Sequence, residues 1–159
     1  MIALDVLVEA GDWAGLGDPE ELGRRAVEAA FGAASDAPRE DVELTLLLTD
    51  DAGIRALNRD FRGRDKPTKV LSFPSPAQPG APGPRHLGDI ALACETLARE
   101  ADEEGKSLQD HATHLVVHGT LHLLGYDHEL EAQAEIMEAL EVKALAALGI
   151  ADPYRDMAA

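Results

Sequence analysis

The stretch LQDHATHLVVHGTLHLLGYDH, residues 108–128, decides the fold of this 159-residue chain. Ser107, with Asp110 three residues later, gives a capping-box signal for the start of a helix, and Gly125 is well placed to end it. After its first turn this helix carries almost no charge. Apolar residues lie all around its circumference: Leu115, Val116, Val117, Leu121, Leu123 and Leu124. A helix of this kind is buried, so we predict that residues 108–124 form the central helix of the domain.

Three histidines in and just after this helix have the spacing of metal ligands. His118 and His122 are four residues apart, which places both rings on one face of the helix. His128 follows Gly125, and a sharp turn there brings its ring back beside the other two. The pattern His-x3-His-x2-Gly-x2-His matches the ligand spacing of the metzincin metalloproteases. We therefore predict that His118, His122 and His128 bind one catalytic metal ion, Zn2+ by preference, with a fourth position open for water.

The alternative is that these three histidines are ordinary core or surface residues. A match of three ligands together with the glycine is far less expected by chance than a single histidine, so the metal site is favoured. Gly119 argues against proteolysis, because peptidases with this pattern have a glutamate directly after the first histidine as general base. We expect a hydrolase in which another group handles the proton.

Three polar neighbours of the ligands have competing interpretations. His114 is a candidate fourth ligand or proton shuttle, but we favour a hydrogen-bonded core histidine because zinc already has its usual three protein ligands. His111 lies one turn earlier and is expected to reach solvent. Asp127 is equally suited to orient a ligand ring from behind or to cap the last helix, so it is not assigned to the catalytic set.

The rest of the chain shows strand and helix patterns in turn. Period-two alternation and short apolar runs predict four strands, at residues 2–8, 42–48, 70–73 and 88–93. Capping and apolar spacing predict four more helices, at residues 18–34, 50–63, 95–104 and 129–148. Residues 74–86 contain five of the nine prolines, which predicts an irregular loop. The fold class is therefore α+β, with a mixed sheet of about four strands and about five helices.

Composition indicates an ordinary globular protein. The length suits a single domain over residues 1–159, and 45% hydrophobic residues provide material for a core. The one cysteine, Cys94, cannot form an internal disulfide, which fits a reducing compartment. No apolar run reaches the roughly 20 residues that span a membrane, and the N-terminus lacks a basic signal-peptide region. We expect a cytoplasmic protein with no membrane partner.

Charge is distributed unevenly along the chain. The net charge of −16 argues against indiscriminate affinity for nucleic acid. Residues 55–69 nevertheless hold six of the fourteen basic residues and only two acids, Asp60 and Asp65. We call this segment the basic strip; it comprises Arg55, Arg59, Arg62, Arg64, Lys66 and Lys69. A solvated helix face and loop would explain it from composition alone, and an anion-binding surface is the functional alternative.

Residues 118–128, HGTLHLLGYDH, resemble the characteristic motif of the YbeY family, bacterial rRNA maturation factors described as single-strand-specific endoribonucleases. Residues 57–63 (LNRDFRG), 66–74 (KPTKVLSFP) and 87–90 (LGDI) resemble further stretches of that family in the same order. The resemblance implies a zincin-like domain with a metal cleft and zinc on the three histidines. It implies roles in 16S rRNA 3′-end processing and ribosome quality control, with single-stranded RNA, the ribosomal small subunit and its assembly factors as partners and no DNA.

The resemblance also implies that Arg62 matches the family's functionally important arginine and faces the cleft. With His118, it completes the expected catalytic pair. Two departures are clear: Lys69 stands where the family usually has an acid, and the proline-rich segment after Pro74 is long. Two alternatives to the endoribonuclease stay open. One is a metal hydrolase of another substrate, and the other is a ribosome-associated assembly factor with a structural metal.

Overall fold

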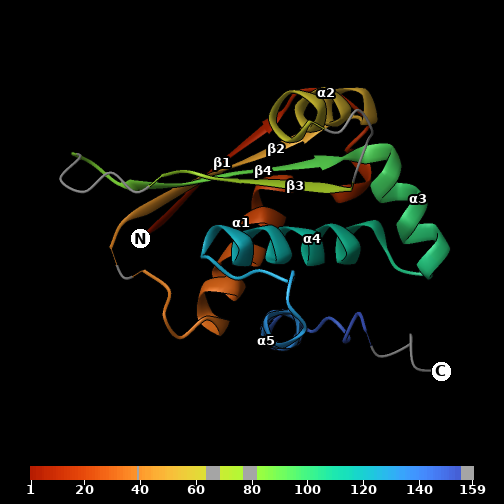
Figure 1. Ribbon diagram of the computed structural model, residues 1–159. Helices are drawn as coiled ribbons and strands as arrows, with labels where there is room; N and C mark the ends of the chain where they lie inside the picture. Colours follow the sequence, from red (N-terminus) through yellow and green to blue (C-terminus); the bar gives the residue numbers. More distant parts are fainter. Residues whose placement is uncertain (39, 64–68, 77–81, 155–159) are drawn as a thin grey trace.

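The computed structural model describes residues 1–38, 40–63, 69–76 and 82–154, which form a four-stranded sheet and five α-helices (Figure 1). The strands are β1 (Ile2–Val8), β2 (Val42–Thr49), β3 (Val70–Pro74) and β4 (Arg85–Ala93), in the spatial order β1-β2-β4-β3. β1, β2 and β4 run parallel, and β3 pairs with β4 in the antiparallel direction. The predicted mixed sheet in an α+β fold is therefore confirmed.

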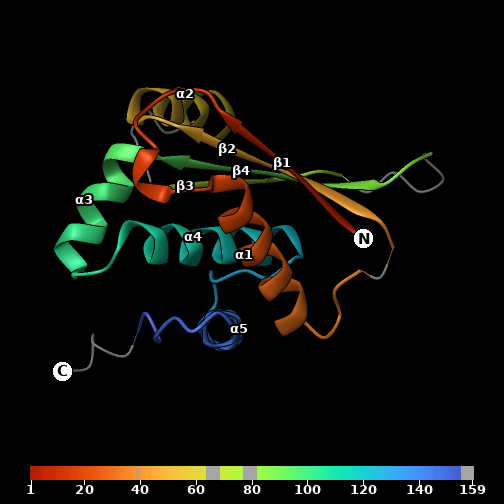
Figure 2. The same ribbon diagram turned by 180° about the vertical axis from the view of Figure 1, so that it is seen from behind.

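Helices cover both faces of this sheet. α2 (Asp51–Arg62) lies alone on one face, where Ile54 packs with Leu71 and Ala91. On the other face lie α1 (Pro19–Ala33) and α4 (Leu108–Leu123), with α5 (Glu131–Ala147) beyond them as an outer layer (Figures 1 and 2). α3 (Cys94–Glu104) joins the end of β4 to α4, and a short 3-10 helix, η1 (Ala14–Leu16), precedes α1. α4 is thus enclosed between the sheet and α5.

The burial of α4 follows from its sequence. Leu115, Val116, Val117 and Leu121 are all buried, as expected for a helix that is apolar on every side. They join the core residues of the central strand β2, among them Leu44, Leu46 and Leu48. Between the sheet and α5 there is little room for polar side chains without partners. The polar rings of the histidines on α4 therefore need partners inside the protein, such as hydrogen-bonding groups or a metal ion.

Capping residues set most helix ends where the sequence predicts them. The side chain of Asp18 accepts hydrogen bonds from the backbone of Glu20 and Glu21, and that of Ser107 accepts one from Asp110. Gly63 ends α2 in the left-handed conformation, with φ of 69°. Two boundaries differ from the prediction by more than one residue. β4 begins at Arg85, because its start pairs with Val42 and extends the parallel ladder, and α5 begins only at Glu131.

Parts of two predicted features lie outside the described residues. They are Arg64 and Lys66 of the basic strip, with Asp65, and residues 77–81 of the proline-rich loop. The prediction of one domain over residues 1–159 stays a prediction. Within the described ranges, no helix has the length and apolar content required to cross a membrane.

Candidate metal centre and its cleft

The three predicted ligands meet at the C-terminal end of α4. One ring nitrogen from each of His118, His122 and His128 lies within 4.8 Å of the others. Nε2 of His118 and Nε2 of His122 are 3.1 Å apart. The structure thus brings together the three side chains that the sequence predicted, although the role of each as a ligand stays a prediction.

The turn that returns His128 to the helix depends on Gly125. Its backbone has φ of +103°, a conformation that favours glycine. The N–H of Gly125 donates to the carbonyl of His122, and the N–H of Tyr126 donates to that of Leu121. These two bonds form a Schellman motif, which satisfies carbonyl groups at the end of the helix while reversing the chain. Gly125 therefore makes the sharp turn that the histidine spacing predicted.

The donor set fits a zinc ion. Tetrahedral zinc with Zn–N distances near 2.0–2.1 Å separates its ligand nitrogens by about 3.3 Å, close to the 3.1 Å between His118 and His122. Burial, together with the neighbouring His118 and His128, lowers the pKa of His122 to about 4. At neutral pH its ring is therefore uncharged, which is the form that binds metals.

A buried carboxylate, Glu141 of α5, lies behind the ligands. It is 0% exposed and accepts hydrogen bonds from Nδ1 of His118, from the hydroxyl of Tyr154 and, at 3.3 Å, from Nε2 of His114. Burial alone would raise the pKa of this carboxyl, but the bonds from His114 and His118 outweigh it and lower the pKa to about 2. Burial and the neighbouring carboxylate also raise the pKa of Tyr154 above its usual value.

Sequence reasoning missed both Glu141 and Tyr154. One signal for Glu141 was present, because it occupies an apolar position of α5, four residues after Met137 and four before Leu145, both of which are buried. An acid in the buried stripe of an amphipathic helix needs a partner inside the protein. Tyr154 follows α5 in an irregular segment, and its place beside Glu141 depends on how that segment folds back.

The histidines upstream of the ligands have different outcomes. His114 is hydrogen-bonded, as predicted, because its Nε2 donates to Glu141, although the residue is only partly buried. The prediction that His111 reaches solvent was wrong. His111 is only 2% exposed, because α3 packs over it and Glu100 accepts a hydrogen bond from its Nε2 at 3.1 Å. Burial lowers the pKa of His111, against the opposing effect of Glu100 and Glu104.

Asp127 does not cap the last helix. The residue at the N-cap of α5 is Leu130, which makes no side-chain cap bond. Instead, the carboxylate of Asp127 accepts a hydrogen bond from the backbone N–H of His128 at 2.7 Å. Asp127 therefore stabilises the turn that carries the third histidine, and the capping interpretation was wrong.

The three histidines open into a cavity of about 830 Å³. Its opposite wall comes from α2, from β3 and from Lys69 just before β3, and it includes Arg62 and Ser72. The guanidinium of Arg62 donates a hydrogen bond to the backbone carbonyl of Ser72 and lies 5.4 Å from the centre of the Phe73 ring. The structure thus places Arg62 in the same cleft as the histidines, while its catalytic role stays a prediction.

Gly119, the residue that argued against proteolysis, packs closely against the sheet. A Cβ atom at this position would lie 2.9 Å from Cγ2 of Ile90 and 3.1 Å from Oγ of Ser72. A longer side chain, such as the glutamate of the peptidases, would have to displace the side chains of Ile90 and Ser72. The packing of this helix therefore agrees with the absence of a peptidase general base.

A comparison with protein families matches residues 19–149 to the family described as Endoribonuclease YbeY. The chain belongs to the YbeY family. This confirms the resemblance seen in the sequence, and the matched range includes the three histidines, Arg62 and Glu141.

Individual YbeY proteins match nearly the whole chain. Endoribonuclease YbeY of Rhodopseudomonas palustris strain BisA53 is 54% identical, with 97% of this chain and 91% of the relative covered. The protein of the same name from Chelativorans sp. strain BNC1 is 56% identical, with 95% and 92% covered. The solution structure of TM1509 from Thermotoga maritima is similar with a TM-score of 0.55, at 25% identity, over 94% of this chain and 92% of that one.

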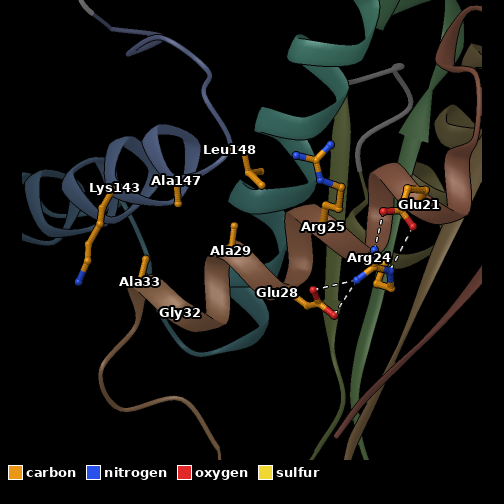
Figure 3. A pocket seen from close by; sticks show the side chains of 10 residues that line it. All are labelled: Glu21, Arg24, Arg25, Glu28, Ala29, Gly32, Ala33, Lys143, Ala147 and Leu148. Carbon is orange, nitrogen blue, oxygen red and sulfur yellow. Dashed lines mark hydrogen bonds and ion pairs between the residues drawn. The ribbon is translucent and has the colours of Figure 1, made fainter.

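A second cavity, of about 530 Å³, lies between α1 and α5 (Figure 3). It shares no lining residue with the cleft of the YbeY motif. Its wall combines small residues such as Ala29 and Ala147 with charged ones, and Arg24 forms ion pairs there with Glu21 and Glu28. No chemistry comparable to the histidine cluster is present in it, so the functional proposal rests on the cleft.

Proposed function

We propose that this chain is a metal-dependent endoribonuclease that cleaves single-stranded RNA and acts in 16S rRNA 3′-end maturation and ribosome quality control. The observation that carries the proposal is the placement of three convergent histidines and Arg62 in one cavity. The names of the relatives support RNA as the substrate. Cytoplasmic location, a single domain over residues 1–159, and the small subunit with its assembly factors as partners belong to the same proposal.

We infer that the metal is zinc and that His118, His122 and His128 hold it. Three imidazoles without thiolates or further carboxylates are a donor set that suits catalytic zinc. Zinc bound there supplies Lewis acidity, which acidifies water and polarises a phosphoryl oxygen. The half-buried positions of His118 and His122 and the exposed position of His128 leave the cluster open toward the cavity. This openness supports an enzyme over an assembly factor with a closed structural site.

Arg62 binds and orients the phosphate in this proposal. A guanidinium presents several N–H donors in a planar fork, which matches phosphate oxygens, and it stays charged at every relevant pH. The carbonyl of Ser72 and the ring of Phe73 hold this guanidinium at the cleft wall. It is therefore positioned in advance to stabilise negative charge that develops on the phosphate during cleavage.

The cleft is less acidic than the protein as a whole, which supports an anionic substrate. Arg62 and Lys69 line its wall and offset the acids Asp127 and Glu129, whereas the chain carries −16. An acidic surface repels nucleic acid elsewhere, so RNA would be retained where the basic residues gather. A small neutral substrate would not require them, and no observation favours that alternative.

A cleavage assay tests the proposal. Purified protein is incubated with a single-stranded fragment of 16S rRNA and with the same fragment annealed to its complement, beside His118→Ala and a chelated sample. We expect the wild type to cleave the single strand. Cleavage should be lost in His118→Ala and in the chelated wild type, and adding zinc back should restore it in the chelated wild type. His86→Ala, a histidine outside the cleft, is the control. Equal cleavage in all samples would refute metal catalysis.

A further inference from the structure

The carboxylate of Glu141 accepts three hydrogen bonds, more than a single ion pair would give it. Its Oε1 accepts from Nδ1 of His118, while its Oε2 accepts from the hydroxyl of Tyr154 and, at 3.3 Å, from Nε2 of His114. A carboxylate without exposure to water is costly unless such donors surround it. Because both oxygens are engaged, the carboxylate is fixed in position and in rotation.

The two nitrogens of the His118 ring face different partners. Nδ1 points to Glu141 on α5, and Nε2 points to Nε2 of His122, toward the cluster of ligands. An ionised carboxylate only accepts hydrogen bonds, so the proton of a neutral His118 ring must be on Nδ1. The lone pair is then on Nε2, the nitrogen that faces the metal position.

Tyr154 orients this carboxylate from the C-terminal segment. Its hydroxyl donates to Oε2 of Glu141, and its ring packs edge-on against His114, with a centroid distance of 5.7 Å and an interplanar angle of 90°. The backbone N–H of Tyr154 donates to the side chain of Asp152 at 2.8 Å, which fixes the turn that presents the ring. The segment after α5 is therefore connected to the ligand His118 through Glu141.

We propose that Glu141 is a positioning residue of the metal centre: it holds His118 in the Nδ1-protonated tautomer, and Tyr154 holds Glu141. Carboxylates behind a ligand histidine fix its tautomer and ring direction, and their loss lowers metal affinity by about 10- to 100-fold. The inference rests on the metal site of the proposed function but not on the identity of the substrate. It also gives the C-terminal segment a role in the active site.

Metal affinity and ring protonation test this inference directly. Zinc affinity is measured by competition with a chromogenic chelator for the full chain, Glu141→Gln, Tyr154→Phe and the control Glu100→Gln. Glu100 also accepts a hydrogen bond from a buried histidine, His111, but lies on α3. We expect a loss of about 10- to 100-fold in Glu141→Gln, a smaller loss of about fivefold in Tyr154→Phe, and wild-type affinity in Glu100→Gln.

Two spectroscopic measurements separate positioning from a merely structural role. Long-range 1H–15N spectra of the zinc-loaded wild type should show the His118 proton on Nδ1, and the visible spectrum of the Co2+-loaded protein should change in Glu141→Gln. Wild-type zinc affinity and an unchanged cobalt spectrum in Glu141→Gln would overturn the inference, even if its melting temperature fell. If Glu141→Gln does not fold, Tyr154→Phe and Glu141→Asp decide by the same measurements. A wild type that binds zinc but cleaves no RNA would refute the proposed substrate and leave this inference intact.

Discussion

Nε2 of His118 and Nε2 of His122 lie 3.1 Å from each other, and a ring nitrogen of His128 lies within 4.8 Å of this pair. Two residues one helical turn apart reach this separation because both rings lie on the same face of α4. Zinc would need its ligand nitrogens about 3.3 Å apart, so its binding requires almost no rearrangement of the helix. A ligand that binds only the folded state stabilises that state.

Zinc should therefore raise the melting temperature of the protein. At a free concentration 100 times Kd, binding adds about 2.7 kcal/mol to the free energy of unfolding. For a chain of this size that corresponds to an increase of about 5–10 °C. Differential scanning fluorimetry with and without zinc measures it, and His118→Ala should abolish the shift while His86→Ala keeps it. A full shift in His118→Ala would contradict the assignment of the ligands.

Replacement of Arg62 should affect turnover and leave the metal in place. In Arg62→Ala we expect kcat for RNA cleavage to fall by about 100-fold, the usual effect of removing one preorganised donor to developing charge. Arg62→Lys should recover only part of this loss, because a lysine lacks the planar fork. Metal content measured on the same samples should equal that of the wild type. Full activity of Arg62→Ala with normal metal content would refute the role of this arginine.

Salt should weaken RNA binding in proportion to the phosphates that the cleft contacts. For single strands, log K falls with log salt by about 0.7 for each phosphate that a basic residue neutralises. Lys69→Ala, made in the non-cleaving His118→Ala background, should therefore reduce that slope by about 0.7. Fluorescence anisotropy at several salt concentrations measures the slope, with Arg24→Ala, distant from the cleft, as control. An unchanged slope in the Lys69 variant would exclude a phosphate contact there.

The features that the sequence predicted correctly depend on local geometry. The spacing of His118 and His122 is a property of any α-helix, and the Gly125 turn needs only its own backbone conformation. The cap at Ser107 is equally local. For these features the chemistry is complete within about ten residues, so no knowledge of the tertiary fold was needed.

The features that were missed depend on which elements pack together. Glu141 contacts His118 across 23 residues of sequence, and no helical or strand period relates the two. His111 was predicted to be exposed because its own helix gives no sign that α3 covers it. The position of β4 between β2 and β3 likewise follows from long-range pairing. The local signal in the sequence was an acidic residue, Glu141, at an apolar position of α5, which indicated a partner inside the protein.

Gly119→Ala should destabilise the protein although alanine is the better helix former. Alanine gains about 1 kcal/mol of helix propensity, but its Cβ would lie 2.9 Å from Cγ2 of Ile90 on a well-packed sheet. Overpacking of this kind costs about 1–3 kcal/mol, so we expect a net loss of about 1 kcal/mol in urea unfolding. Gly32→Ala on α1, where nothing lies within 4 Å of the added atom, should instead stabilise by about 0.5 kcal/mol. Equal effects of the two substitutions would contradict the close approach of α4 to the sheet.

His111 should make the stability of the protein fall as the pH is lowered. Burial lowers the pKa of this ring in the folded state, so the unfolded chain takes up its proton at a higher pH than the folded chain does. Its contribution to stability is therefore complete above its unfolded pKa, near 6.5, and is lost as the pH falls through its folded pKa. One such group changes the free energy of unfolding by at most about 1.4 kcal/mol per pH unit.

Urea unfolding of the chelated protein between pH 7.5 and about pH 5 measures this slope, and His111→Gln should make it shallower because the titrating ring is gone. Glu100→Gln should act in the opposite direction. The carboxylate of Glu100 raises the pKa of His111 against the effect of burial, so its removal lowers that pKa further and makes the loss of stability steeper. Parallel pH profiles for the wild type and both variants would show that His111 is not a source of the acid sensitivity. A shallower slope in His111→Gln together with a steeper slope in Glu100→Gln would show that the acid sensitivity arises at the contact between α3 and α4.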